Sequence, residues 1–112
     1  MTTRRVFVIW AHPIFHESVR RLLTHPDIEW LGATADHVAA RDQIASLQPD
    51  TVLVEEEEGV RPLAGVLEIL EASLYDVRVI RLSLAGNELS VYHCEHRTME
   101  QADDLLHLIL TY

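Results

Sequence analysis

The chain has 112 residues, of which 48% are hydrophobic, and its 18 acidic and 9 basic side chains give a formal net charge of -9. This length fits one domain, and the apolar content is too high for a disordered chain, so we expect a single domain over residues 1–112. Such an acidic surface repels nucleic-acid phosphates and anionic lipids, which excludes nucleic acid and membranes as expected partners. All the basic residues are arginine, so the chain contains no lysine.

The cysteine content and the chain ends indicate where the protein works. Cys94 is the only cysteine, so no internal disulfide can form, and a reducing cytoplasm is the expected location. The first apolar stretch, residues 6–11, is too short for a signal-peptide core, and no later stretch approaches a membrane span. Because the first predicted strand begins near Met1 and the last helix ends near Tyr112, we expect a stand-alone domain without an effector domain.

The first part of the chain alternates strand-like and helix-like patterns. Val6–Ile9 is a continuous apolar run, typical of a strand buried on both faces. Pro13 suits the first position of a helix. The apolar stripe of that helix is predicted to contain Phe15, Val19, Leu22 and Leu23.

The same alternation continues through the middle of the chain. Ile28–Thr34 is predicted as a second strand, and Thr51–Val54 as a third, buried strand. Between them a helix ends before Pro49. A further helix beginning at Pro62 should precede a fourth strand, Val77–Leu84. The apolar positions of these two helices are Ala40, Ile44 and Leu47 in the first, and Leu63, Val66, Leu67 and Leu70 in the second.

The order of these elements predicts the fold class. Strands that alternate with helices pair in parallel through right-handed crossovers, which place helices on both faces of the sheet. We therefore predict a three-layer, doubly wound α/β fold.

The end of the chain breaks the alternation. Only Ala85–Asn87 separate the fourth strand from a fifth, Glu88–Glu95, and three residues are too few for a parallel crossover. The fifth strand should therefore run antiparallel to the fourth in a hairpin, with no helix between them. A last helix should follow, capped by Thr98 with Gln101 in the capping-box position. Its inward-facing positions are predicted as Ala102, Leu105, Leu106 and Ile109.

Three segments resemble the receiver domain of bacterial response regulators. Residues 5–9 with the following His12-Pro13 resemble its first strand and the start of its first helix. Residues 49–54, with the sequence PDTVLV, resemble the segment before its phosphoacceptor aspartate. Residues 79–83 resemble its fourth strand, which ends in a switch hydroxyl. The resemblance covers about residues 4–84 and implies a CheY-like fold with strand order 2-1-3-4-5.

The resemblance also implies four functional positions at the carboxyl ends of the strands, and this chain departs from three of them. An acid pair that holds a divalent cation is replaced by Trp10 and Ala11, and the phosphoacceptor is replaced by Glu55. No lysine exists for the position after the fifth strand. Ser83 alone keeps the expected residue type. We therefore expect no phosphoryl transfer, no enzymatic activity, no cofactor and no bound metal.

Glu55 and Trp10 each have a structural and a functional interpretation. A glutamate in the acceptor position can imitate the phosphorylated state, but the favoured interpretation is that Glu55 begins a solvated acidic run, residues 55–58. Trp10 is expected to plug the former active-site mouth rather than to stack on a ligand.

Two groups of histidines have the residue types of a metal site, but a metal site is not the favoured interpretation of either. His12 and His16 have the i, i+4 spacing of a helical metal pair, with Glu17 or the Glu55 run as a third ligand. The motif at residues 93–96, HCEH, has good zinc-ligand types, but alternate residues of a strand point to opposite faces.

The sequence as a whole predicts a pseudo-receiver that acts without phosphorylation as a protein–protein interaction module in bacterial signal transduction or regulation. Its expected partner is another protein, with a homodimer favoured. Leu89 and Val91 mark an edge strand that a second chain can pair with; packing through the terminal helix is the other dimer mode. The alternative is a small metal- or ligand-binding protein, or an enzyme, whose site would be lined by His12, Glu55, Glu56 and Ser83.

Overall fold

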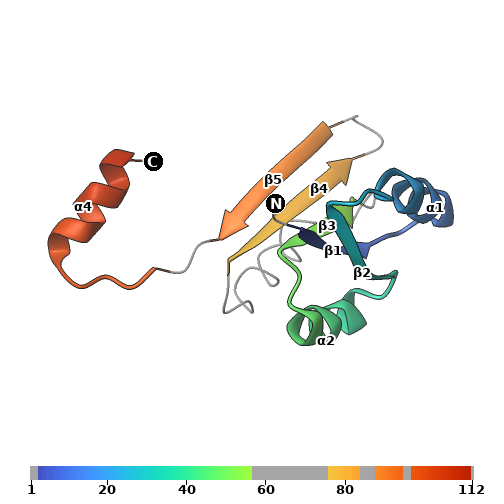
Figure 1. Ribbon diagram of the computed structural model, residues 1–112, viewed down its shortest axis with the longest axis horizontal. Helices are drawn as coiled ribbons and strands as arrows, with labels where there is room; N and C mark the ends of the chain where they lie inside the picture. The colour runs from blue at the N-terminus through green and yellow to red at the C-terminus, as the bar shows by residue number, and fades with distance from the viewer. Residues whose placement is uncertain (1–2, 57–75, 84–87, 95–96, 112) are drawn as a thin grey trace.

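The computed structural model describes residues 3–56, 76–83, 88–94 and 97–111. Five strands and three helices lie within these ranges (Figure 1). In chain order they are β1 (Arg4–Ile9), α1 (Pro13–Leu22), β2 (Ile28–Thr34), α2 (His37–Leu47), β3 (Thr51–Glu55), β4 (Val77–Ser83), β5 (Glu88–Cys94) and α4 (Ala102–Thr111). The helix expected from Pro62, with Leu63, Val66, Leu67 and Leu70, lies outside the described residues.

The sheet confirms the predicted topology. Its strand order is β2-β1-β3-β4-β5, with parallel pairing from β2 to β4. β5 pairs antiparallel with β4, from Val77 opposite Cys94 to Ser83 opposite Glu88. The four residues between these two strands are too few for a crossover helix, which is why the strand direction reverses.

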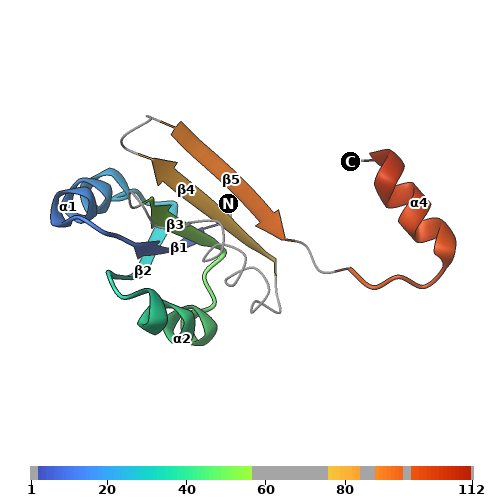
Figure 2. The same ribbon diagram turned by 180° about the vertical axis from the view of Figure 1, so that it is seen from behind.

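Helices α1 and α2 cover opposite faces of the sheet, as a doubly wound fold requires. On one face, Ala40 and Ile44 of α2 pack against odd-numbered β1 residues and even-numbered β3 residues. On the other face, Phe15 and Val19 of α1 pack against the alternate positions of the same strands (Figure 2). The strand residues of the two cores are Phe7, Ile9, Val52, Val54, Val77 and Val79 on the α2 face, and Val6, Val8 and Leu53 on the α1 face.

Local sequence signals explain where the helices start and stop. Pro13 opens α1 after the N-cap residue His12, and the Asp36 side chain caps α2 by accepting from the backbone of Val38 and Ala39. α2 ends at Gln48, which has a left-handed conformation with φ 50°. One predicted position of α1 is wrong, because Leu22 points to solvent. Among the described segments, no helix is both long and apolar enough to cross a bilayer.

The last helix forms as predicted but does not lie where predicted. Figures 1 and 2 both show α4 standing apart from the sheet, and none of its side chains is buried. The Cα radius of gyration, 15.5 Å, exceeds the value of about 13 Å expected for a compact chain of this length. The expectation that Ala102, Leu105, Leu106 and Ile109 face inward is therefore wrong in this conformation.

The start of α4 also differs from the prediction. Asp104 Oδ2 accepts hydrogen bonds from the backbone N–H groups of Glu100 and Gln101, at 3.0 and 3.2 Å. An acid three residues into the helix thus reaches back over its first turn, which is one half of a capping box. The box is displaced by three residues from the one predicted at Thr98, because Asp104 supplies the acceptor.

Candidate functional site

The predicted functional positions gather at one edge of the sheet. Trp10 and Ala11 directly follow β1, while Glu55 and Ser83 are the last residues of β3 and β4. These three strands are neighbours in parallel register, so their carboxyl ends meet at the same edge. This edge is where open α/β sheets bind ligands.

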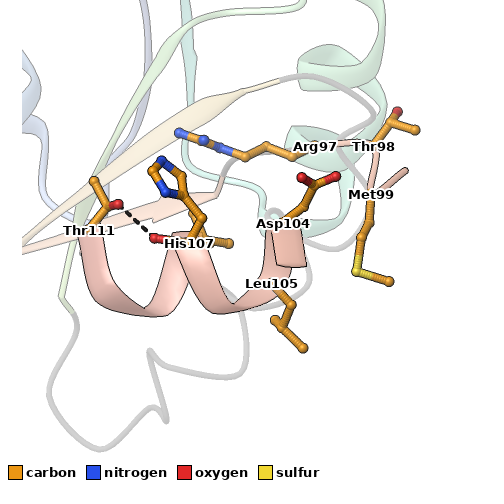
Figure 3. Close-up of a pocket in the computed structure, with 8 residues that line it drawn as sticks. Arg97, Thr98, Met99, Asp104, Leu105, His107 and Thr111 are labelled. Atoms are coloured by element: carbon orange, nitrogen blue, oxygen red, sulfur yellow. Dashed lines mark hydrogen bonds between the residues drawn. The ribbon is translucent and has the colours of Figure 1, made fainter. Parts of the chain in front are cut away.

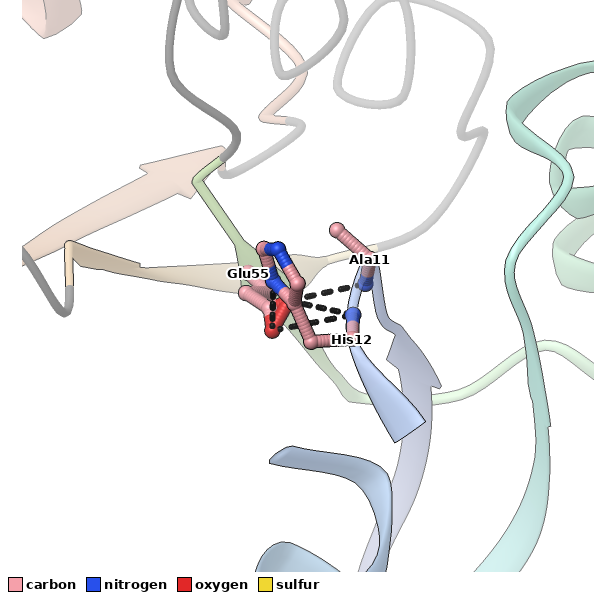
Figure 4. A network of polar contacts seen from close by, with 3 residues as sticks. All are labelled: Ala11, His12 and Glu55. Atoms are coloured by element: carbon pink, nitrogen blue, oxygen red, sulfur yellow. Dashed lines mark hydrogen bonds and ion pairs between the residues drawn. The ribbon is translucent and has the colours of Figure 1, made fainter. Parts of the chain in front are cut away.

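Glu55 is the centre of this edge, and its side chain is fully buried. Its carboxylate oxygen Oε2 accepts from the backbone N–H of Ala11 at 2.8 Å and from that of His12 at 2.9 Å (Figure 4). The His12 ring nitrogen Nδ1 lies 3.1 Å from the same oxygen, a contact that becomes a hydrogen bond when Nδ1 carries the proton. Two backbone amides and one imidazole nitrogen from a single loop therefore lie around one carboxylate oxygen.

The loop between β1 and α1 presents these donors because of its backbone path. Successive N–H groups that point to the same side form an anion-binding nest, and the start of a helix adds further partial positive charge. His12, as the N-cap of α1, belongs to both features. The interpretation of Glu55 as the start of a solvated run is therefore wrong, because only 2% of the residue is exposed.

The side chain of Trp10 lies against α1. Its ring stacks on that of His16 in α1, with centroids 5.1 Å apart, and it packs with the α1-face core. His16 in turn meets Trp30 of β2 at 5.9 Å, and Arg20 lies 4.5 Å over the Trp30 ring. The side chain that fills the position between β1 and β3 is Glu55. The i, i+4 pairing of His16 and Arg20 on α1 was the sequence signal for this cluster.

The reversal of β5 changes the fourth functional position. In a receiver the lysine follows the fifth strand at the carboxyl edge, as the resemblance implies. Here β5 begins at that edge, where Glu88 lies opposite Ser83, and it ends at the opposite edge. The chain thus brings an exposed acid to the side of the sheet where a receiver places its cation.

A second acid of the run is also engaged. The Glu56 backbone N–H donates to Leu82 O at 2.7 Å, which extends the pairing of β3 and β4 by one residue. The Glu56 carboxylate lies 3.9 Å from Nε of Arg81, whose guanidinium is 5.7 Å from the Tyr92 ring centroid. Glu57 and Glu58 lie outside the described residues.

The histidines considered as metal ligands, His12 and His16, make contacts with different side chains. His12 contacts Glu55, while His16 stacks between two tryptophans. Of the HCEH motif, Glu95 and His96 lie outside the described residues. In the part of the chain that the structure describes, no three histidine, cysteine or acidic side chains converge as a metal site would require.

Comparison with solved structures decides the fold family. The receiver domain of the putative response regulator NarL from Mycobacterium tuberculosis superposes with a TM-score of 0.63 and 27% identity, over 74% of this chain and 68% of that one. This chain has the fold of a response-regulator receiver domain. A LuxR-family response regulator from Aurantimonas sp. SI85-9A1 gives a TM-score of 0.64 at 22% identity, over 74% of this chain. A mutant of the anti-anti-sigma factor PhyR from Bartonella quintana gives 0.62 at 14% identity, over 72%.

These matches cover only part of two of the solved chains. The receiver-like chain spans 34% of the PhyR chain and 60% of the LuxR-family chain. No protein-family model and no curated protein matches the sequence. The receiver-like fold supports a role in signal transduction, and the proteins that share it are regulatory.

Proposed function

We propose that this chain is a pseudo-receiver, a receiver-like domain that acts without phosphorylation as a protein–protein interaction module in bacterial signal transduction. The observation that carries the proposal is the buried Glu55 carboxylate, bonded to the amides of Ala11 and His12. The replacement of the acid pair by Trp10 and Ala11 and the absence of lysine favour the same proposal.

Phosphoryl transfer to a receiver requires an accessible carboxylate beside a divalent cation, because the cation offsets the negative charge of the acyl phosphate. Glu55 is neither accessible nor placed beside other acids that hold such a cation, since Trp10 and Ala11 take their positions. A phosphoryl group would also meet Glu88 at the edge where a lysine is needed. These features favour a domain whose state does not depend on phosphorylation.

The bonded carboxylate also suggests how the domain holds one state. In Glu55 the anion is part of the polypeptide, and its donors belong to the loop that leads into α1. The loop is therefore held in place at all times, whereas a receiver's acid pair depends on a bound cation. We infer a constitutive interaction surface rather than a switched one.

The proposed partner is a protein, and a second copy of the chain is favoured. Leu89 and Val91 on the edge strand β5 are more than half exposed, at 59% and 55%. An edge strand with exposed apolar side chains is a surface that a second chain can cover. With a single cysteine and an acidic surface, we expect the domain to work in the cytoplasm.

Intact-mass spectrometry after incubation with acetyl phosphate and Mg²⁺ tests the proposal, with an active receiver as the positive control. We expect no added phosphoryl mass on this chain under conditions in which the control is modified. A stable adduct that survives in the Glu55→Gln variant would identify another acceptor. An adduct that is lost in Glu55→Gln would mean that Glu55 leaves its nest. Either adduct overturns the proposal.

A further inference from the structure

Two apolar surfaces of the chain face solvent and lie apart from one another. One is a stripe on α4, where four large side chains are 53–77% exposed: Leu105, Leu106, Ile109 and Leu110. The other is the α1-side face of β4 and β5, which we call the hairpin face and which consists of Ile80, Leu82, Leu89 and Val91. In this face Leu89 and Val91 are exposed, while Ile80 and Leu82 are partly buried beside the α1-face core. The pairing places Leu82 opposite Leu89 and Ile80 opposite Val91, so all four point to the same side.

The helix needs a surface to pack on. A ten-residue helix is marginal in water by itself, because the gain from propagation barely offsets the cost of nucleation. The side of α4 that carries His107 and Leu108 faces the segment that leads into the helix. Figure 3 shows Arg97 lying along that side, and a groove of about 500 Å³ lies between residues 97–99 and α4, where it is lined by Asp104, Leu105, His107, Leu108 and Thr111. Of the stripe, Leu106, Ile109 and Leu110 do not line this groove and stay available for another surface.

One end of the hairpin face carries charged side chains of both signs. At the end of the hairpin face where β5 finishes, a groove of about 440 Å³ is lined by Arg4, Arg78 and His93, together with Asp50, Asp76, Val77 and Val91. Asp50 already accepts from the Arg5 amide and the Thr51 hydroxyl. The Arg78 atom Nε is buried and has no hydrogen-bond partner within the described residues. The exposed Asp103, in the acidic first turn of α4, has the charge that pairs with the arginines of this groove, Arg4 and Arg78.

Residues 97–111, which we call the arm, comprise α4 and the segment that leads into it. Their placement favours a second copy of the chain, rather than the helix's own sheet, as the surface that α4 covers. Arg97, Thr98 and Met99 line one groove with α4, so the segment that leads into the helix lies along it (Figure 3). Figures 1 and 2 both show α4 standing apart from the sheet, beyond the end of β5. To cover its own hairpin face, α4 would have to turn back toward the sheet, whereas a second copy can meet the apolar stripe where it lies.

We propose that two copies of the chain exchange their terminal helices, with the apolar stripe of α4 from one copy packed on the hairpin face of the other. The proposal rests on the proposed function, because it names the partner of the same interaction module. Such an exchange is isologous, so each contact occurs twice and one two-fold axis closes the assembly. It leaves the α2 face and the Glu55 nest unchanged.

Site-specific cross-linking between differently tagged chains tests the exchange. In a Cys94→Ser background, a chain with Val91→Cys is mixed with a chain with Leu106→Cys and treated with a short bis-maleimide. We expect a covalent species of twice the chain mass that contains both tags. The matched control replaces Val91→Cys by Val38→Cys, which lies on the exposed start of α2, and should give no such species.

The double variant Val91→Cys with Leu106→Cys separates the two modes of docking. If α4 covers its own sheet, this chain cross-links internally at monomer mass and the mixed sample does not cross-link, which overturns the exchange. A chain that remains monomeric at all concentrations and forms neither product also overturns it.

Sedimentation equilibrium gives a second, independent readout. Leu106→Asp should raise the dimer dissociation constant at least tenfold, whereas Val38→Asp, an apolar-to-acid change at another exposed position, should leave it unchanged. Equal effects of the two variants would contradict the proposed interface. These outcomes do not depend on phosphorylation, so the acetyl phosphate experiment fails or succeeds separately from them.

Discussion

Burying a carboxylate is costly unless hydrogen bonds replace the water that it loses. Glu55 recovers those bonds from two backbone amides and one imidazole, all within one short loop. The residue therefore links the end of β3 to the start of α1, across 43 and 44 positions of sequence. Its carboxylate is buried and hydrogen-bonded inside the protein, which distinguishes it from the accessible acceptor of a working receiver.

We predict that Glu55→Gln destabilises the domain by about 1–2 kcal/mol. The amide keeps the shape of the side chain, but it removes the charge that strengthens each hydrogen bond and turns an NH₂ group toward part of the nest. Urea unfolding of both proteins, followed by circular dichroism, measures the difference.

The neighbouring variant Glu56→Gln is the matched control. Its carboxylate lies 3.9 Å from Arg81 in a partly exposed ion pair, which solvent screens, so the change should cost less than about 1 kcal/mol. If Glu55→Gln were as mild as Glu56→Gln, the nest would contribute little and the account of Glu55 would be wrong.

The burial of Glu55 could not be predicted from the sequence. Four consecutive glutamates are typical of a solvated surface, and the sequence around Ala11 and His12 does not show that their amides point to one side. Only the location of Glu55 at the end of the third strand could be predicted, because the apolar run of residues 51–54 shows where that strand ends. The contact that matters joins distant segments, and only the folded backbone brings them together.

The end of α2 allows a prediction at the scale of one element. Gln48 has a left-handed backbone, with φ 50°, which costs a residue with a Cβ atom about 1 kcal/mol. Glycine takes this conformation without that cost. We therefore predict that Gln48→Gly stabilises the domain by about 0.5–1 kcal/mol in urea unfolding.

The same substitution inside the helix should have the opposite sign. Gln43 is exposed in the interior of α2, where glycine weakens a helix by about 1 kcal/mol. Gln43→Gly should therefore destabilise the domain, and the pair of variants isolates the backbone effect from the loss of the side chain. Two changes of the same sign would show that the cap geometry does not control stability.

At the scale of elements, the sequence predicts the direction of β5 but not the location of α4. The reversed β5 follows from the length of its connection to β4, because four residues cannot form a crossover. The strand order was implied by the resemblance to receivers. The existence of α4 follows from its apolar period, but its location does not. An apolar stripe shows that a helix packs on something, and it does not say whether that surface belongs to the same chain.

At the scale of the whole molecule, the fold divides into a closed core and an open arm. β1 and β3 lie at the centre of the sheet, with α1 and α2 on opposite faces, and hold most of the buried side chains. α4 has no buried side chain and leaves the body at the end of β5. The core resembles receivers, while the arm and the reversed strand are where this chain departs from them.

Hydrogen exchange followed by mass spectrometry should detect this division. Amides of β1 and β3 should be the most protected, because they exchange only when the core unfolds. Amides of α4 should exchange rapidly in dilute protein and gain protection as the concentration rises, because mass action favours the state in which a second copy covers the helix. The Leu106→Asp variant should keep α4 unprotected over the same range. Protection of α4 that is independent of concentration would mean that the helix packs on its own chain, and the arm would then be part of a closed monomer.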